Sequence, residues 1–273
     1  MITMPYLFQI GAIRGQILAD GHDVLTLERV ARMFPDHADQ IQAASGKSLG
    51  TMSRNILLMD VGDERILIDS GEGNMVAESP GTLFASLAIY EIDLDSIDTV
   101  IITHFHLDHI GGLLDGHGKP TFPNARLVAS KAEFDHWMNE NFLATMEAFR
   151  ANLLRQTFDA YTRVDLIAGE VEVAPGVTLL PAYGHTPGHS AVLIESEGSR
   201  LLHIVDAMHL PAQINLPDAR PKYDSQPEIA VATRHALINR AESENLQLLV
   251  YHFAFPGLGH IRRDGDRRVW SPV

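Results

Sequence analysis

Hydrophobic positions divide the first half of the chain into short apolar runs and one helical stretch. The segments Met52–Val61 and Arg65–Asp69 predict a β-hairpin, because the Gly-Asp pair between them is typical of a turn. Apolar residues recur at helical spacing over Gly81–Tyr90, whereas Thr99–Thr103 has the β-branched, mostly apolar sequence of a strand buried on both faces. The predicted order is therefore strand, strand, helix, strand.

The second half continues this alternation of helices and strands. A helical pattern extends from Lys131 to about Thr162, and we expect this segment to lie over a site as a cap. Another helix is predicted for Gln226–Glu244. Four further segments resemble strands: Val177–Ala182, Ala191–Glu195, Arg200–Val205 and Leu246–Tyr251. No internal repeat or flexible linker interrupts the pattern, so residues 1–273 are predicted to form a single layered α/β domain.

The composition restricts the chemistry that the chain can perform. It has 21 Lys and Arg against 35 Asp and Glu, a net charge of −14, and no Cys. Disulfides, iron–sulfur clusters, thiolate zinc sites and cysteine nucleophiles are excluded, so any metal must have nitrogen and oxygen ligands. The negative charge argues against a nucleic-acid partner and favours a small neutral organic substrate.

Targeting signals are not recognisable in the sequence. No apolar run approaches the roughly 18 residues of a transmembrane helix, so no membrane partner is expected. The first basic residue is Arg14, and the N-terminal sequence therefore lacks the charged region of a secretory signal. We expect a cytoplasmic protein. Its apolar N-terminal segment and Phe-rich cap could support a homodimer.

The most informative segment is THFHLDHIGG, which follows the predicted strand Thr99–Thr103. His104 and His106 are two residues apart in extended chain, so both can face one metal ion. If a helix begins near Asp108, then Asp108 and His109 turn toward a second ion, and the following glycine pair permits close packing. A lone His at a strand end is usually a core residue, but four potential ligands at this spacing favour a metal centre.

This segment resembles the hallmark His-x-His-x-Asp-His motif of the metallo-β-lactamase superfamily. The resemblance extends to Asp69 in RILIDSGEG, His185 in YGHTPGHS, Asp206 in LLHIVD and His252 in LLVYHFAFPG. It implies an α/β fold, an αββα sandwich of two mixed β-sheets with outer helices. Within the superfamily, the tail HFAFPGLGHIRRDGDRRVWSPV and the 21-residue step from His185 to Asp206 are most similar to methyl parathion hydrolases and related lactonases.

The resemblance also implies a set of ligands for two divalent ions, with Zn expected and Mn, Co or Fe as alternatives. Asp206 would bridge the ions, and Asp69 would accept a hydrogen bond from a ligand histidine or simply cap a turn. His189 is the alternative ligand to His185. The two expected ligand groups are His104, His106 and His185 for one ion, and Asp108, His109 and His252 for the other.

The predicted function is that of a binuclear metal-dependent hydrolase of neutral esters, either lactones or organophosphate triesters. A metal-bridging hydroxide would attack the substrate, and Asp108 would orient it. His209 is a candidate proton donor to the leaving group, although a structural role fits it equally. Trp137 either lines the substrate pocket, as the resemblance implies, or packs in the core.

Two other classes of function compete with this prediction. The same fold hosts di-iron redox enzymes, whose motif normally has Glu in place of His106. A metal-binding protein without catalysis is the other alternative, but structural zinc sites are closed, whereas this ligand set leaves positions to solvent.

Overall fold

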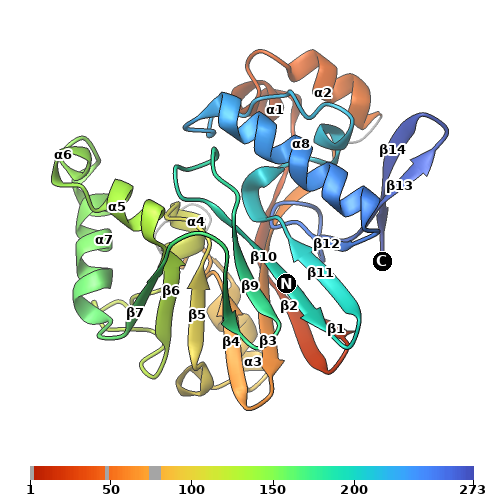
Figure 1. The fold of residues 1–273 in the computed structure, drawn as a ribbon. Coiled ribbons are helices and arrows are strands. Elements are labelled where there is room, and N and C mark those ends of the chain that lie inside the picture. Colours follow the sequence, from red (N-terminus) through yellow and green to blue (C-terminus); the bar gives the residue numbers. More distant parts are fainter. Residues whose placement is uncertain (1–2, 47–48, 74–80) are drawn as a thin grey trace.

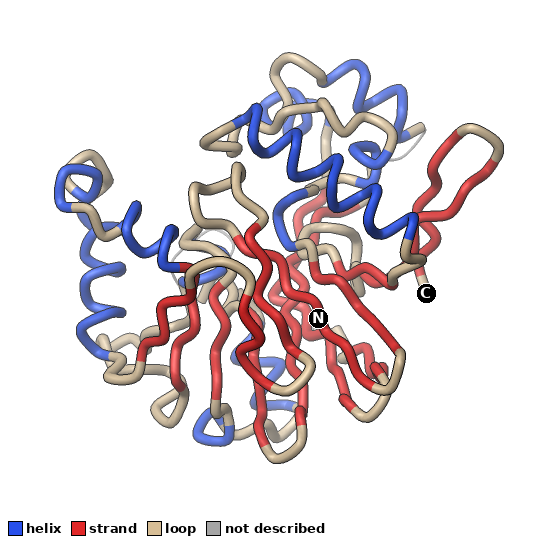
Figure 2. The backbone as a smooth tube through the Cα atoms, viewed as in Figure 1, coloured by secondary structure: helices blue, strands red, loops and turns tan. Residues whose placement is uncertain are grey.

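Two seven-stranded β-sheets pack face to face, with helices on their outer faces (Figure 1). The computed structural model describes residues 3–46, 49–73 and 81–273. Figure 2 shows the strands in the centre of the molecule and most of the helices at its periphery. This arrangement confirms the predicted αββα sandwich.

The first sheet is mixed and follows the chain order β1-β2-β3-β4-β5-β6-β7. Its first four strands are antiparallel to their neighbours, and the pairs from β4 to β7 are parallel. The strands are β1 (Tyr6–Ile10), β2 (Ile13–Val24), β3 (Thr51–Val61), β4 (Glu64–Ile68), β5 (Thr99–Ile102), β6 (Arg126–Ser130) and β7 (Val164–Ile167).

The second sheet has the order β14-β13-β12-β11-β10-β9-β8, and only β11 and β12 pair in parallel. A long helix, α8, connects these two strands, as parallel neighbours require. The strands are β8 (Val171–Ala174), β9 (Val177–Pro181), β10 (Ser190–Ser196), β11 (Ser199–His203), β12 (Gln247–Leu249), β13 (Leu258–Asp264) and β14 (Arg267–Pro272).

Helices occupy the connections between strands. The α-helices are α1 (Leu27–Met33), α2 (Ala38–Ser45), α3 (Leu83–Ile89), α4 (Leu107–Ile110), α5 (Lys131–Trp137), α6 (Glu140–Leu143), α7 (Ala148–Ala160) and α8 (Pro227–Ser243). Three short 3-10 helices are η1 (Leu94–Ser96), η2 (Val205–Ala207) and η3 (Pro211–Ile214).

Successive residues of the central strands belong to different hydrophobic layers. In β5, Ile101 packs between the two sheets, whereas Val100 and Ile102 face the layer formed with α3 and the helices α5 to α7. In β10, Val192 faces the other sheet, whereas Leu193 faces the layer beneath α8. Because strand side chains alternate between faces, such strands need apolar residues at nearly every position.

The expected elements are largely present, with one difference in the cap. The hairpin β3–β4, helices α3 and α8, and strands β5 and β9 to β12 confirm the predictions. The segment after Lys131, however, forms three helices rather than one. Asn139 interrupts it, because its side chain accepts hydrogen bonds from the backbone N–H groups of Asn141 and Phe142 and so begins a new helix, α6.

Several elements were not predicted from the sequence. They are the N-terminal strands β1 and β2, the helices α1 and α2, the strands β6 to β8, the C-terminal hairpin β13–β14 and the three 3-10 helices. Among the described residues, no helix combines the length and the apolar character needed to cross a bilayer.

Candidate metal centre

The candidate ligands lie in the segments that follow β5, β9, β11 and β12, so both sheets contribute to one site. His104 follows β5, and His106 immediately precedes the one-turn helix α4, which carries Asp108 and His109. The expected helix start near Asp108 is therefore present. A Cβ atom on Gly112 would lie 2.1 Å from the Ser70 carbonyl oxygen, which explains why glycine follows the motif.

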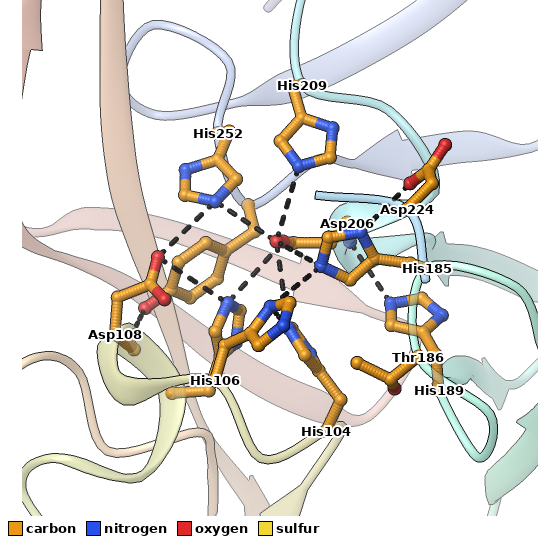
Figure 3. Close-up of polar contacts among 12 residues, drawn as sticks. His104, His106, Asp108, His185, Thr186, His189, Asp206, His209, Asp224 and His252 are labelled. Carbon is orange, nitrogen blue, oxygen red and sulfur yellow. Dashed lines mark hydrogen bonds and ion pairs between the residues drawn. The ribbon is translucent and has the colours of Figure 1, made fainter. Parts of the chain in front are cut away.

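Three histidine rings converge in the first part of the site (Figure 3). His106 Nδ1 lies 3.0 Å from His104 Nε2 and 2.9 Å from His185 Nε2. Asp206 Oδ2 lies 3.4 Å from His185 Nε2. One ligand atom from each of these four residues lies within 4.8 Å of the others. This spacing permits all four to contact one cation.

A second group lies on the other side of Asp206. Its members Asp108, His109 and His252 also offer ligand atoms within 4.8 Å of one another. His252 Nε2 lies 3.4 Å from Asp108 Oδ2 and 3.2 Å from Asp206 Oδ2, and His109 Nε2 lies 3.5 Å from Asp206 Oδ1. Asp206 thus faces both groups, and the structure brings all seven expected ligands together.

Buried polar atoms that lack a hydrogen-bond partner indicate where a cation would fit. His109 Nε2 and Asp206 Oδ1 are buried, and neither has a hydrogen-bond partner among the described residues. Leaving such atoms without a partner costs about 1–3 kcal/mol each. Nitrogen and carboxylate donors at this spacing suit Zn, Mn, Co or Fe. The site therefore fits two divalent cations.

Three ligand histidines each place Nδ1 against a protein oxygen. His109 Nδ1 lies 2.8 Å from Asp69 Oδ2, His185 Nδ1 lies 3.0 Å from Asp224 Oδ1, and His252 Nδ1 lies 3.0 Å from the carbonyl oxygen of Ser53. A proton donated from Nδ1 leaves the lone pair of Nε2 directed at the cluster, which is the usual arrangement around metal-binding histidines.

The two supporting carboxylates are themselves held by hydrogen bonds. Asp69, whose φ of 63° lies in the left-handed region, accepts from the backbone N–H and the hydroxyl of Thr103 at 2.9 and 2.8 Å. Asp224 Oδ2 accepts from the fully buried Arg234 at 2.9 Å. These contacts fix the carboxylates and, through them, the rings of His109 and His185.

His189 has a different position from His185. Its Nδ1 donates to the Ala182 carbonyl at 2.8 Å, and its Nε2 accepts from the Asp206 backbone N–H at 3.2 Å. Both ring nitrogens are therefore engaged, which favours His185 as the ligand. Val205, just before Asp206, has a φ of 51°, a strained value for a β-branched residue, and this turn directs the Asp206 side chain inward.

Burial and neighbouring charges move the pKa values of the site in opposite directions. Burial, followed by repulsion from neighbouring histidines, lowers the pKa of His106 to about 3, and burial lowers that of His185 to about 3. Burial also disfavours protonation of His109, but the carboxylates of Asp206, Asp69 and Asp108 outweigh it and raise its pKa. Neutral imidazole is the form that binds metal, so the first group is ready to do so at neutral pH.

A cavity of about 380 Å³ opens onto the cluster. Besides candidate ligands, it is lined by Met52, Leu107, Tyr223 and His209 and by the charged residues Asp23, Arg29, Arg54, Glu72 and Arg150. The ring of His209 stacks on that of His252 with centroids 5.3 Å apart, and its Nε2 lies 3.6 Å from Asp206 Oδ2. His209, His252 and Asp206 form a further group with ligand spacing.

Trp137, the last residue of α5, points into the hydrophobic core and is 8% exposed. Its ring meets that of His106 edge to face at 5.7 Å. Because Trp137 is not among the residues that line the cavity, its position favours core packing over substrate contact.

Sequence reasoning missed several residues that support the site. Asp224 and Arg234 lie near and within α8, far from any ligand motif, so no local pattern identified them. The ring of Tyr251 packs against that of His109 with centroids 4.1 Å apart and the ring planes tilted by 30°, and its hydroxyl donates to the carbonyl of Asp108. The only indication of this role in the sequence was that Tyr251 directly precedes the candidate ligand His252.

Comparison with known proteins gives relatives over part of the chain. A Bacillus thuringiensis N-acyl homoserine lactonase is 28% identical over 140 residues, which cover 51% of this chain and 49% of the relative. A probable metallo-hydrolase of Mycobacterium tuberculosis is 26% identical over 181 residues, 57% of this chain and 56% of the relative. The chain thus matches only about half the length of these curated relatives.

Solved structures match over the whole chain. The dizinc quorum-quenching lactonase AidC, solved with a product, superposes with a TM-score of 0.88 at 24% identity, covering 100% of this chain and 98% of AidC. The hydrolase AbOPH superposes with a TM-score of 0.87, also at 24% identity and with the same coverage. These likenesses establish the fold.

The sequence profile of one family covers the segment that carries the candidate ligands. It matches residues 49–252, a span that begins before β3 and ends at His252. The chain belongs to the metallo-beta-lactamase superfamily.

Proposed function

We propose that this protein is a binuclear metal-dependent hydrolase of neutral esters, with lactones as its first substrate class. The observation that carries the proposal is the position of Asp206, whose carboxylate lies between two groups of ligand atoms at the base of an open cavity. A carboxylate in this position can contact two cations at once.

We assign one cation to each of the two groups of ligand residues. His104, His106 and His185 would hold one cation, and Asp108, His109 and His252 the other, with Asp206 shared. Bound divalent cations would supply a Lewis acid for the ester oxygen and a water nucleophile available near neutral pH.

Access to solvent distinguishes this site from a structural one. The Asp108 side chain is 27% exposed and lines the cavity, whereas the His104 and His109 side chains are fully buried. Structural zinc sites are closed by their ligands, and catalytic sites keep an open position. Asp108 can therefore orient a water molecule in the cavity as well as contact a cation, which supports catalysis over simple metal storage.

His209 is proposed to give a proton to the leaving oxygen. Its ring lines the cavity, and its Nε2 faces the carboxylate of Asp206 at 3.6 Å, whereas its Nδ1 is buried and has no hydrogen-bond partner within the described parts of the chain. Burial lowers its pKa to about 3, so the ring is neutral at pH 7 and carries one transferable proton. A neutral imidazole N–H at this position can donate a hydrogen bond to the alkoxide as the ester opens, and the proton that it gives up would be replaced by the one released from the attacking water.

Lactones are preferred because of the relatives that the chain matches. Curated relatives are named N-acyl homoserine lactonases, and AidC was solved with a lactone-derived product. The sequence resemblance to methyl parathion hydrolases keeps aryl phosphotriesters as the second class. One site can act on lactones and on phosphotriesters, because in both classes water attacks an electrophilic atom, carbon or phosphorus, that bears an ester oxygen.

Metal analysis combined with a substrate panel tests the proposal. We expect two divalent ions per chain by elemental mass spectrometry. We also expect hydrolysis of an acyl lactone that a chelator abolishes and added Zn²⁺ restores. An aryl phosphotriester and a thioester complete the panel. A fully metal-loaded protein that is inactive on all three substrates would overturn the proposal.

A further inference from the structure

Glu133 is a wholly buried carboxylate outside the ligand set. It lies in α5, the first helix of the cap, and its exposed fraction is 0%. Its Oε1 accepts a hydrogen bond from the Phe105 backbone N–H at 2.9 Å. Its Oε2 accepts from the Thr186 hydroxyl at 2.7 Å and from the Gly188 backbone N–H at 2.8 Å. One side chain therefore satisfies three donors.

These donors belong to the two loops that carry the first ligand group. Phe105 stands between His104 and His106, in the loop after β5 of the first sheet. Thr186 directly follows His185, in the loop between β9 and β10 of the second sheet. Glu133 thus joins loops from different sheets, and two of its three hydrogen bonds end one residue from a candidate ligand.

Glu133 is also linked to Asp206, the carboxylate that faces both ligand groups, through Gly188 and His189. Gly188 directly precedes His189, whose Nε2 accepts from the Asp206 backbone N–H. A Cβ atom on Gly188 would lie 2.0 Å from the Glu133 backbone nitrogen, so only glycine allows the loop to approach α5 this closely. Movement of this loop would displace both His185 and His189.

A carboxylate is a costly way to fill this space. Among the described residues, no Lys, Arg or His forms an ion pair with Glu133, and burying an unpaired carboxylate is expensive unless hydrogen bonds satisfy it. An apolar side chain would fill the volume at lower cost but would leave two backbone N–H groups without an acceptor. The carboxylate is explained by the need to hold both loops.

We propose that Glu133 is a positioning residue that fixes the two ligand loops relative to each other before any cation binds. The expected effect of Glu133 on metal affinity rests on the proposed function, because that effect requires His104, His106 and His185 to share a cation. The expected effect of Glu133 on the positions of the two loops does not depend on the proposed function. Preorganised ligands bind metal more tightly, since less ordering remains to be done on binding.

The substitution Glu133→Gln keeps the shape of the side chain and removes one acceptor. Whichever way the amide is turned, its NH₂ group faces a backbone N–H, that of Phe105 or that of Gly188. The matched control is Asp135→Asn, a change of the same type on the same helix at an exposed residue that pairs with Lys131. Both substitutions replace a carboxyl group by the amide of the same shape.

Hydrogen exchange of the metal-free protein is the first measurement. In Glu133→Gln we expect faster exchange in peptides from both loops, residues 103–110 and 184–190, and no change there in Asp135→Asn. Faster exchange in only one loop, or in α5 alone, would overturn the proposal. If Glu133→Gln does not fold, Thr186→Val removes one donor and should produce the same two-loop change with smaller amplitude.

Metal binding is the second measurement, made by competition with a chromophoric chelator and by the visible spectrum of the Co²⁺-loaded protein. We expect Glu133→Gln to bind Zn²⁺ about 10–100-fold more weakly and to change the Co²⁺ spectrum. A role limited to core packing would lower stability and leave that spectrum unchanged, which would overturn the proposal. A wild-type protein that binds no metal would instead overturn the proposed function, and hydrogen exchange would still decide the role of Glu133.

Discussion

At the residue scale, the Asp206 carboxylate contacts histidines of both candidate ligand groups. It lies within 4 Å of nitrogens of His104, His109, His185, His209 and His252. Burial would raise its pKa, but the charges of His252 and His109 outweigh burial and hold the pKa well below its usual value. The carboxylate is therefore ionised and available to cations at neutral pH.

The first prediction concerns this carboxylate. Asp206→Asn should reduce the bound divalent metal from two ions per chain to one or none, because an amide oxygen carries no net charge to hold a second cation. Lactone hydrolysis should fall by about 100-fold or more. The control is Asp218→Asn, an exposed partner of His235. Unchanged metal content in Asp206→Asn would contradict the bridging role.

The second prediction separates proton donation from metal binding at His209. In His209→Gln, kcat for a lactone, which has a poor alkoxide leaving group, should fall by about 100-fold or more. A nitrophenyl ester should be much less affected, because nitrophenolate leaves without protonation. Metal content should remain at two ions per chain. Loss of metal would show that His209 is a ligand, as its spacing to Asp206 and His252 also permits.

The third prediction follows from the burial of Glu133, which raises its pKa from 4.5 to about 7 despite the opposing hydrogen bonds. Between these pH values the folded protein holds a proton that the unfolded chain has released. The resulting stabilisation is present below about pH 4.5 and is lost as the pH rises to about 7. Urea unfolding of the metal-free protein should show that the free energy of unfolding of the wild type, relative to that of Glu133→Gln, falls as the pH rises from about 4.5 to about 7. A difference that is constant with pH would contradict it.

At the element scale, the cap shows how a polar residue changes a predicted helix. The pattern after Lys131 predicted one helical segment, but the side chain of Asn139 caps a new helix and divides the segment. The longest piece, α7, still packs an apolar face that includes Leu153 and Leu154 against the core. Its position over α5 and the first sheet is therefore set by burial and not by continuity of the helix.

The fourth prediction tests that packing. Leu154 is 2% exposed, so Leu154→Ala should lower the free energy of unfolding by about 2–5 kcal/mol through lost burial and the cavity that remains. Gln156→Ala, at an exposed position of α7, should change it by less than about 0.5 kcal/mol. Urea denaturation measures both. Equal effects of the two substitutions would show that α7 does not pack as described.

At the scale of the whole molecule, the candidate ligands connect the two sheets. His104 and His109 extend from the first sheet, and His185, Asp206 and His252 from the second. The hydrophobic layer between the sheets does not involve these residues. The fold should therefore form without cations, and bound cations should add stability to it.

The fifth prediction is the effect of metal removal. Chelation should abolish hydrolysis, leave the far-ultraviolet circular dichroism unchanged and lower the unfolding temperature. Free metal at 100 times its Kd stabilises the native state by about 2.7 kcal/mol per site. Re-addition of Zn²⁺ should restore both properties. Loss of secondary structure on chelation would instead favour a structural role for the metal.

The sequence by itself determined the central elements and indicated the candidate ligands. Runs such as Thr99–Thr103 are apolar at consecutive positions because both faces of the strand are buried, and that pattern is visible without a structure. The His-x-His-x-Asp-His motif was visible because its residues are close in sequence. By contrast, β14 alternates between exposed and half-buried residues and gave no strong signal.

Only the tertiary structure decided how distant residues meet. It placed Asp224 and Arg234 behind His185, engaged both nitrogens of His189 with backbone groups, and brought Glu133 between the two ligand loops. The physical reason is that local patterns record which face of an element is buried. The partners of a buried polar group depend on which elements pack together, and that packing is settled by the whole chain.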